Sequence, residues 1–147
     1  MGIVDDLGAG PIAIDTAPFI YLIEEHPRFL AVVNPVFEAI ARGELLAVAS
    51  ELTLLEVLVV PFRAGDAALA ARYEELLSES RGLTLVGLDR SVLREAARLR
   101  ATKGLKTPDA IQAATALGAG CTALLTNDRA FGTLQGVRVV NVSDYLG

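Results

Sequence analysis

The chain has 147 residues, of which 52% are hydrophobic, and it carries a net charge of −5. By the usual size range this is one domain, residues 1–147, and it can bury roughly 70% of its unfolded surface, so it needs no disulfide to fold. The negative charge excludes a protein that grips nucleic acid with its whole surface, although cations bound to clustered carboxylates would change the sign locally.

The first half of the chain alternates short aliphatic runs with amphipathic segments. Gly43 and Ser50 mark two boundaries, because glycine favours the end of a helix and serine favours its beginning. The predicted elements are a strand at Ile12–Ile14, helices at Ala17–Glu24 and Arg28–Arg42, a strand at Leu45–Ala49 and a helix that begins after Ser50.

The second half continues this alternation. Its predicted elements are a helix at Ala67–Glu79, a strand at Leu83–Leu88, a helix from Asp89 to about Thr102, a helix from Thr107 to Gly118–Gly120, a strand at Thr122–Thr126, a helical turn at Asp128–Phe131 and a strand at Val137–Val142. Thr107 is the predicted N-cap of its helix, with Pro108 at the first helical position. Aliphatic strands separated by helices predict a three-layer α/β fold, a parallel sheet covered on both faces.

No segment predicts a membrane span or an exported protein. The longest apolar stretch, Leu45–Val60, is interrupted by Glu51 and Glu56, whereas a membrane helix needs about 20 predominantly apolar residues. No basic segment precedes an apolar one near the N-terminus, and the single cysteine, Cys121, cannot form a disulfide within the chain. We expect a soluble cytoplasmic protein.

Three aspartates stand where predicted strands end or a helix begins. Asp15 closes the first strand, Asp128 follows the strand that ends at Thr126, and Asp109 opens its helix. Each has a structural explanation: capping for Asp15 and Asp128, and an interaction of about 0.3–1 kcal/mol with the helix dipole for Asp109. Taken together, however, they fit one sheet edge, because ligands of parallel sheets bind at the carboxyl ends of the strands.

Glu56 is harder to explain by local structure. Apolar residues surround it in the run Leu52–Val60, and no basic residue lies one helical turn away. A helix that is apolar all round is expected to be buried, and a buried carboxylate without a partner costs several kcal/mol. An exposed stripe or a distant arginine would also explain Glu56, but a metal ion is the more economical hypothesis.

Four gathered carboxylates would need cations or bound protons. At about 6 Å apart they repel by roughly 2–3 kcal/mol per pair at an effective dielectric near 20. Oxygen ligands completed by water suit Mg²⁺ or Mn²⁺. Zinc is disfavoured, because one histidine and one cysteine cannot build an ordinary structural zinc site.

The order and spacing of the acidic segments resemble a known family. These segments are Ile14–Thr16, Ser50–Val57, Thr107–Ala116 and Leu125–Phe131. They are similar to segments of the PIN-domain family, and within it of the VapC-like toxins of bacterial and archaeal toxin–antitoxin pairs. The resemblance implies a central parallel sheet of about five strands, homodimerisation, a cognate antitoxin and Mg²⁺- or Mn²⁺-dependent endoribonuclease activity.

Position by position, the resemblance assigns an acidic quartet and its polar neighbours. Many members have a further acid where this chain has Ala130, which puts a second metal site in doubt. The quartet is Asp15, Glu56, Asp109 and Asp128, and the neighbouring polar residues are Thr16, Thr126 and Asn127.

The predicted reaction is hydrolysis of RNA phosphodiester bonds by metal-activated water. The three aspartates would hold the metal directly or through water, and Glu56, a fourth candidate ligand, would orient or deprotonate the attacking water. The segment 90–106 holds six basic residues against one acid, which indicates either a solvated helix face or a ridge that positions phosphates. The predicted substrate contacts are Lys106, Arg129 and Arg98.

Other protein classes fit less well. A phosphatase of the haloacid dehalogenase type needs a second aspartate two positions after the first, where this chain has Ala17. A receiver domain needs its phosphoacceptor aspartate on a later strand with an acidic pair before it, whereas Asp5 and Asp6 precede any apolar strand. The serious rival is a catalytically inactive PIN-like module that binds RNA or protein. An antitoxin segment is expected to cover the pocket, and the apolar helices between Phe19 and Ile40 would contact either the antitoxin or a second copy of the chain.

Overall fold

The computed structural model describes residues 2–147, which contain one sheet of five parallel strands in the order β3-β2-β1-β4-β5. The strands are β1 (Ile12–Ile14), β2 (Ala47–Ser50), β3 (Leu83–Val86), β4 (Ala123–Thr126) and β5 (Arg138–Asn141). This topology confirms the predicted α/β class with a central parallel sheet.

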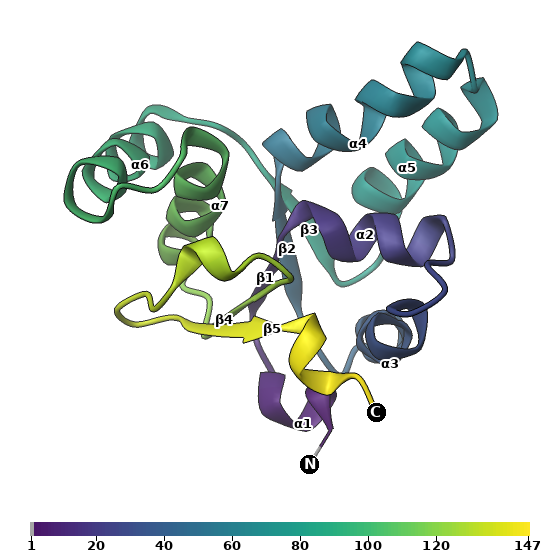
Figure 1. The fold of residues 1–147 in the computed structure, drawn as a ribbon, viewed down its shortest axis with the longest axis horizontal. Coiled ribbons are helices and arrows are strands. Elements are labelled where there is room, and N and C mark those ends of the chain that lie inside the picture. The colour runs from purple at the N-terminus through teal and green to yellow at the C-terminus, as the bar shows by residue number, and fades with distance from the viewer. Residues whose placement is uncertain (1) are drawn as a thin grey trace.

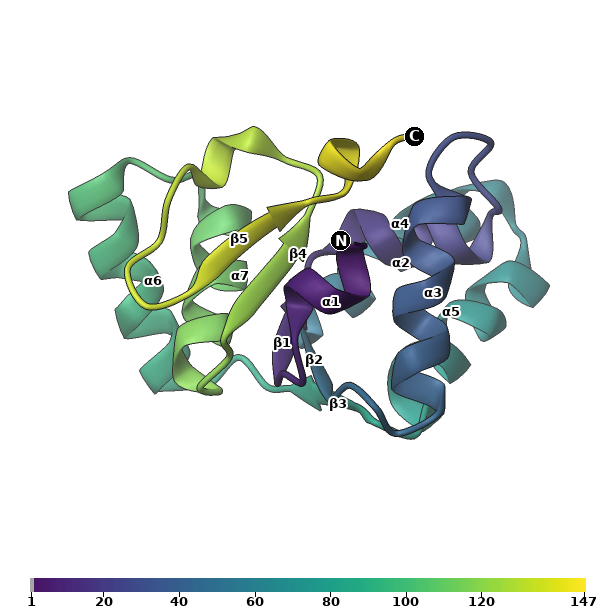
Figure 2. The ribbon, with the colours of Figure 1, turned by 90° about the horizontal axis from the view of Figure 1, so that it is seen from below.

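Helices cover both faces of the sheet (Figures 1 and 2). On one face lie α1 (Ile3–Leu7), α2 (Thr16–Ile23), α3 (Leu30–Ala41), α4 (Glu51–Ala64) and α5 (Ala67–Glu79). On the other lie α6 (Arg90–Lys103) and α7 (Thr107–Gly118), and short 3-10 turns η1 (Arg129–Phe131) and η2 (Val142–Tyr145) flank β5. No helix within residues 2–147 has the length and apolar character to cross a membrane.

The alternation of side chains along the strands divides the core into two clusters. Ile12 and Ile14 face the first cluster together with Phe19 and Tyr73, whereas Ala13 faces the second, between β1 and α7. All five residues are buried. Because β1 is the middle strand and is covered on both sides, its carboxyl end is held in place by the core.

The structure moves most predicted element boundaries by one or two residues and adds one helix. Lys106, not Thr107, is the N-cap of α7, and this cap makes no side-chain hydrogen bond, since both Thr107 and Pro108 already lie inside the helix. The last strand ends at Asn141, and Val142 begins η2. Helix α1 was not predicted, because its five residues are too few to display a helical repeat.

Helix α4 is not buried all round, contrary to the sequence prediction. Its inner side packs through Val57 and Leu58, while its outer side leaves large apolar side chains open to solvent. The exposed ones are Leu55 (61% exposed), Val59 (41%), Val60 (59%) and Phe62 (64%). We call these four residues the α4 apolar face; within residues 2–147 nothing covers them.

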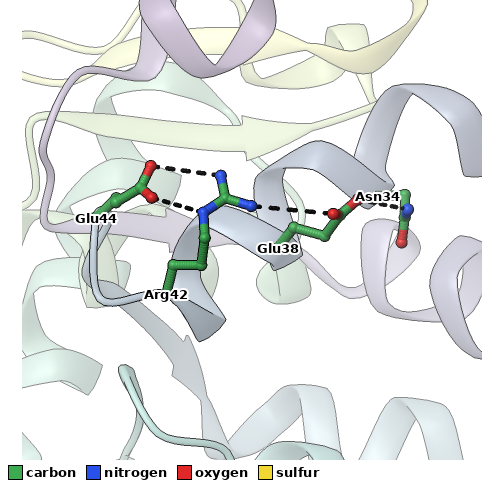
Figure 3. Close-up of polar contacts among 4 residues, drawn as sticks. All are labelled: Asn34, Glu38, Arg42 and Glu44. Atoms are coloured by element: carbon green, nitrogen blue, oxygen red, sulfur yellow. Dashed lines mark hydrogen bonds and ion pairs between the residues drawn. The ribbon is translucent and has the colours of Figure 1, made fainter.

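Helix α3 ends in a small surface network, drawn in Figure 3. The Arg42 guanidinium donates to Glu44 through Nε (2.5 Å) and lies 3.9 Å from Glu38, which accepts a hydrogen bond of 2.8 Å from Asn34. These side chains are exposed, so the network adds little to stability. It follows the turn at Gly43, whose φ of +77° favours glycine.

Candidate active site

The strand order creates a ligand-binding position beside β1. The chain leaves β1 for β2 on one side and returns from β3 to β4 on the other side. Open α/β sheets bind ligands at such a switch point, outside the carboxyl ends of the strands. Here Asp15 follows β1, and its backbone N–H donates to Leu125 of β4 at 2.9 Å, which joins the two strand ends.

A pocket of about 280 Å³ opens at this edge and brings the four predicted acids together. One follows the end of β1, one lies on α4, one lies in the first turn of α7, and one lies between β4 and η1. Two predicted polar residues, Thr16 and Asn127, also line it, whereas Thr126 lies buried directly behind. The acidic residues of the pocket are Asp15, Glu56, Asp109 and Asp128.

Asp15 is held by hydrogen bonds at both carboxylate oxygens. Oδ1 accepts from the backbone N–H of Thr16 at 2.8 Å, as an N-cap does, and Oδ2 accepts from the Thr126 hydroxyl at 2.8 Å. Burial raises the pKa of Asp15, and the charges of Asp109 and Glu56 raise it further, against the lowering effect of the two hydrogen bonds. Capping and clustering are therefore both real properties of this residue.

Thr126 also positions Asp128. Its hydroxyl oxygen accepts from the backbone N–H of Asp128 at 3.0 Å, and Asp128 in turn caps η1 by accepting from Ala130 at 2.8 Å. Thr126 has no exposed surface, so its single hydroxyl links the Asp15 carboxylate to the Asp128 backbone from inside the sheet edge. This arrangement leaves the Asp128 carboxylate at the mouth of the pocket.

Asp109 lies near charges of both signs: the carboxylates of Asp128 and Glu56 and the ammonium group of Lys106. Burial raises its pKa, and the carboxylates of Asp128 and Glu56 raise it further, while Lys106 acts in the opposite direction. These charge effects indicate that the carboxylates are close enough to repel one another. Of the three predicted substrate contacts, Lys106 is the one whose charge reaches the acidic pocket.

The partner of Glu56 is a hydroxyl group. Its Oε1 accepts a hydrogen bond of 2.5 Å from Thr16, the first residue of α2. The structure thus supplies a neutral donor rather than the distant arginine that the sequence left open. Glu56 is half-buried and lines the pocket, and Val59 and Val60 of the apolar face lie one helical turn farther along the same side of α4.

The donor set suits a hydrated hard cation. Carboxylate oxygens from four segments and a threonine hydroxyl surround the pocket. Within residues 2–147, no three carboxylate, imidazole or thiol groups lie close enough together to form a metal-binding cluster as they stand. A cation held here would therefore be bound partly through water, as Mg²⁺ commonly is, and it would offset the repulsion that raises the pKa values of Asp15 and Asp109.

The other two predicted substrate contacts lie outside the pocket lining. Arg98 pairs with Glu95 at 3.1 Å and borders a separate hollow between α6 and α7. Arg129 pairs with Asp144 at 2.6 Å on the surface. Among residues 2–147, no hydrogen bond or ion pair joins either guanidinium group to the four acids.

The sequence analysis missed two polar residues of the pocket lining, Tyr21 and Gln112. The Tyr21 hydroxyl accepts from the Asn127 side chain at 3.0 Å, and Asn127 is itself fixed by Ser143. Gln112 is buried in the middle of α7 among alanines and an isoleucine. A polar residue inside an apolar helix face was a detectable signal for Gln112, whereas nothing distinguished Tyr21.

Comparisons with known proteins agree with this architecture. Residues 12–136 match the model of the PIN domain family. No curated protein sequence gives a significant match.

Among solved structures, a toxin–antitoxin complex from Klebsiella pneumoniae has 23% identity, covers 89% of this chain and 97% of its own, and gives a TM-score of 0.68. VapBC2 from Rickettsia felis bound to a promoter DNA fragment has 19% identity, coverages of 88% and 97%, and a TM-score of 0.69. FitAcB from Neisseria gonorrhoeae has 19% identity, coverages of 90% and 98%, and a TM-score of 0.65. At these identities the likeness establishes the fold.

Proposed function

Because this chain belongs to the PIN domain family, we propose that it is a Mg²⁺- or Mn²⁺-dependent endoribonuclease and the toxin of a toxin–antitoxin pair. One observation carries the proposal: four carboxylates from four separate segments line a single pocket at the switch point of the sheet. Burial and mutual repulsion raise the pKa values of two of them, as is common at sites that bind cations or move protons.

Three aspartates would hold the cation. Asp15, Asp109 and Asp128 surround the pocket from β1, α7 and the end of β4. A cation bound there would lower the pKa of a water molecule that it holds and would stabilise negative charge on the phosphoryl oxygens. Thr126 holds the Asp15 carboxylate and the Asp128 backbone in place, so that little reorganisation of the backbone is needed on binding.

Glu56 is the proposed general base. Its Oε1 is engaged by Thr16, which leaves Oε2 without a hydrogen bond among the described residues and able to accept a proton from water. General-base catalysis of this kind contributes typically 10²–10⁴-fold to a rate. Lys106 is the proposed contact to the RNA phosphate nearest the acids, while Arg98 and Arg129 would contact phosphates farther along the strand after releasing their present partners.

The test is cleavage of labelled structured RNA by highly purified protein. Wild type with Mg²⁺ or Mn²⁺ is compared with EDTA treatment, with Asp109→Asn and with the matched control Asp144→Asn, which changes an exposed aspartate paired with Arg129. We expect cleavage to disappear in EDTA and in Asp109→Asn and to persist in Asp144→Asn. Cleavage that survives Asp109→Asn would place the activity elsewhere and contradict the assignment.

The alternative, a PIN-like module that binds without cleaving, predicts a different result from the same samples. Such a module would bind RNA in a gel-shift assay with equal affinity in Mg²⁺ and in EDTA and would release no product. Metal titration then separates the two functions, because only the nuclease requires the acidic pocket to bind the cation.

The proposed partners are a cognate antitoxin and a second copy of the chain. The neighbouring folds from Klebsiella pneumoniae and Rickettsia felis are described as a toxin–antitoxin complex and as VapBC2. We assign the α4 apolar face to an antitoxin segment, because Val59 and Val60 of this face lie one helical turn from Glu56, so a partner docked there would lie next to the pocket. Light scattering of the isolated chain tests the homodimer, and dimer loss on Phe62→Ser would assign the face to self-association instead.

A further inference from the structure

A chain of buried hydrogen bonds leads from α7 to Glu56. The side-chain amide of Gln112 donates to the Thr53 hydroxyl at 2.9 Å, the Thr53 and Thr16 hydroxyls lie 3.1 Å apart, and Thr16 donates to Glu56 at 2.5 Å. A longer contact of 3.4 Å joins Gln112 directly to Thr16. Gln112 is 2% exposed and Thr53 has no exposed surface.

The chemistry of the two ends fixes the direction of every bond in this chain. An ionised carboxylate only accepts, so the single proton of the Thr16 hydroxyl goes to Glu56. Thr16 must therefore accept from Thr53, whose own oxygen accepts from the Gln112 amide nitrogen Nε2, an atom that only donates. One proton arrangement satisfies all the donors, and all of them point toward Glu56.

The chain connects three separate helices behind the pocket. Thr16 begins α2, Thr53 and Glu56 lie one turn apart on α4, and Gln112 lies on α7 on the far side of the sheet. Glu56 would otherwise be a flexible side chain on a helix whose outer side is open to solvent. A buried, fully directed network restricts such a side chain more than a single bond does.

We propose that Gln112 and Thr53 are positioning residues that hold the Glu56 carboxylate, through Thr16, in the orientation that accepts a proton from the attacking water. The inference rests on the proposed nuclease function. Gln112 lines the pocket and Thr53 lies behind it, but their side chains bond to threonine hydroxyls and not to the four acids, so both act on Glu56 through the hydroxyl of Thr16.

Matched threonine variants test the role of Thr53. Thr53→Val removes the hydroxyl at nearly constant volume, Thr53→Ser restores it, and Thr115→Val makes the same change at a buried threonine whose hydroxyl bonds only to Ile111 in its own helix. We expect Thr53→Val to lower kcat roughly ten- to hundred-fold with little change in KM, because misplacing a catalytic group costs rate rather than binding. Thr53→Ser should recover most of kcat, and Thr115→Val should retain it.

A double-mutant cycle distinguishes positioning from general damage. If Thr53 acts through Glu56, adding Thr53→Val to Glu56→Gln should cause little further loss of kcat. A double variant whose fold-loss of kcat equals the product of the two single-variant losses would overturn the inference. A Thr53→Val variant with wild-type kcat would also overturn it. The same cycle can be repeated with Gln112→Leu in place of Thr53→Val, because Gln112 is the donor at the other end of the chain of bonds.

A readout without RNA separates this inference from the nuclease proposal. In ¹⁵N-labelled protein, the side-chain amide of Gln112 should exchange slowly with solvent, and Thr53→Val should shift it and speed its exchange, whereas Thr115→Val should not. A wild-type chain that cleaves no RNA would refute the nuclease. An amide unaffected by Thr53→Val would refute the hydrogen-bond chain, whatever the activity.

Discussion

Thr126→Val removes one hydroxyl that serves two acidic residues. In the folded protein this hydroxyl donates to Oδ2 of Asp15 at 2.8 Å and accepts from the backbone N–H of Asp128 at 3.0 Å. Thr126 has no exposed surface, so water cannot take its place beside Asp15. The substitution keeps the side-chain volume, which isolates the hydrogen bonds from packing.

The expected cost follows from the two bonds. A hydrogen bond to a charged group contributes about 1.5–3 kcal/mol, and the neutral bond adds about 0.5–1.5 kcal/mol, at the lower end because Asp128 is exposed and water can bind its N–H. The free energy of unfolding should therefore fall by about 2–4 kcal/mol. For a protein of this size, that corresponds to a decrease in Tm of roughly 5–15 °C.

Thr126→Ser is the informative control. It keeps the hydroxyl and removes a buried methyl group, at a cost of about 1 kcal/mol. Urea unfolding followed by circular dichroism in EDTA should rank the proteins in the order wild type, Thr126→Ser, Thr126→Val. The deficit of Thr126→Val should be larger near about pH 8 than near about pH 5, because the Thr126 bond lowers the pKa of Asp15 and so stabilises the ionised form. A valine variant as stable as the serine variant would refute this reasoning.

Three further predictions concern charge and surface. Asp109→Asn should stabilise the metal-free protein by roughly 1 kcal/mol, after solvent screening, because it removes repulsion by two carboxylates; a Tm in EDTA equal to or below that of wild type would contradict this. Asp15 and Asp109 have pKa values in the folded protein above those in the unfolded chain, so the folded chain binds more protons. The free energy of unfolding should therefore fall as pH rises above about 4, by comparison with the variant that carries asparagine at both positions, and adding Mn²⁺ should reverse this loss. Leu55→Ser with Phe62→Ser should change the free energy of unfolding by less than about 0.5 kcal/mol per site while lowering the binding of an apolar dye; a large loss of stability would show that the face is packed.

The features that the sequence could predict are those that depend on neighbouring residues in the chain. The run Ile12–Ile14 followed by Asp15 contains both a buried strand and the acid at its end, and the structure places them so. The positions of Asp109 and Asp128 could be predicted in the same way, because Asp109 stands at a recognisable helix start and Asp128 after a recognisable strand end. Their shared pocket follows from the rule that parallel strands place their carboxyl ends together.

The features that could not be predicted depend on residues far apart in the chain. The bonds from Thr16 to Glu56 and from Gln112 to Thr53 span 40 and 59 positions, and no local pattern announces them. The outer side of α4 was misjudged for a related reason. Phe62 looks like a core residue by composition, and only the packing of α4 against its neighbours decides which of its apolar sides meets solvent.

The order of the strands also sets when the pocket can exist during synthesis. β1 is made early, yet its neighbour β4 and the Asp128 segment that completes the pocket are made after α6 and α7. A growing chain therefore carries the Asp15 and Glu56 segments without the acids that face them until β4 has left the ribosome. The order of synthesis therefore keeps the acidic centre incomplete until most of the domain has been made.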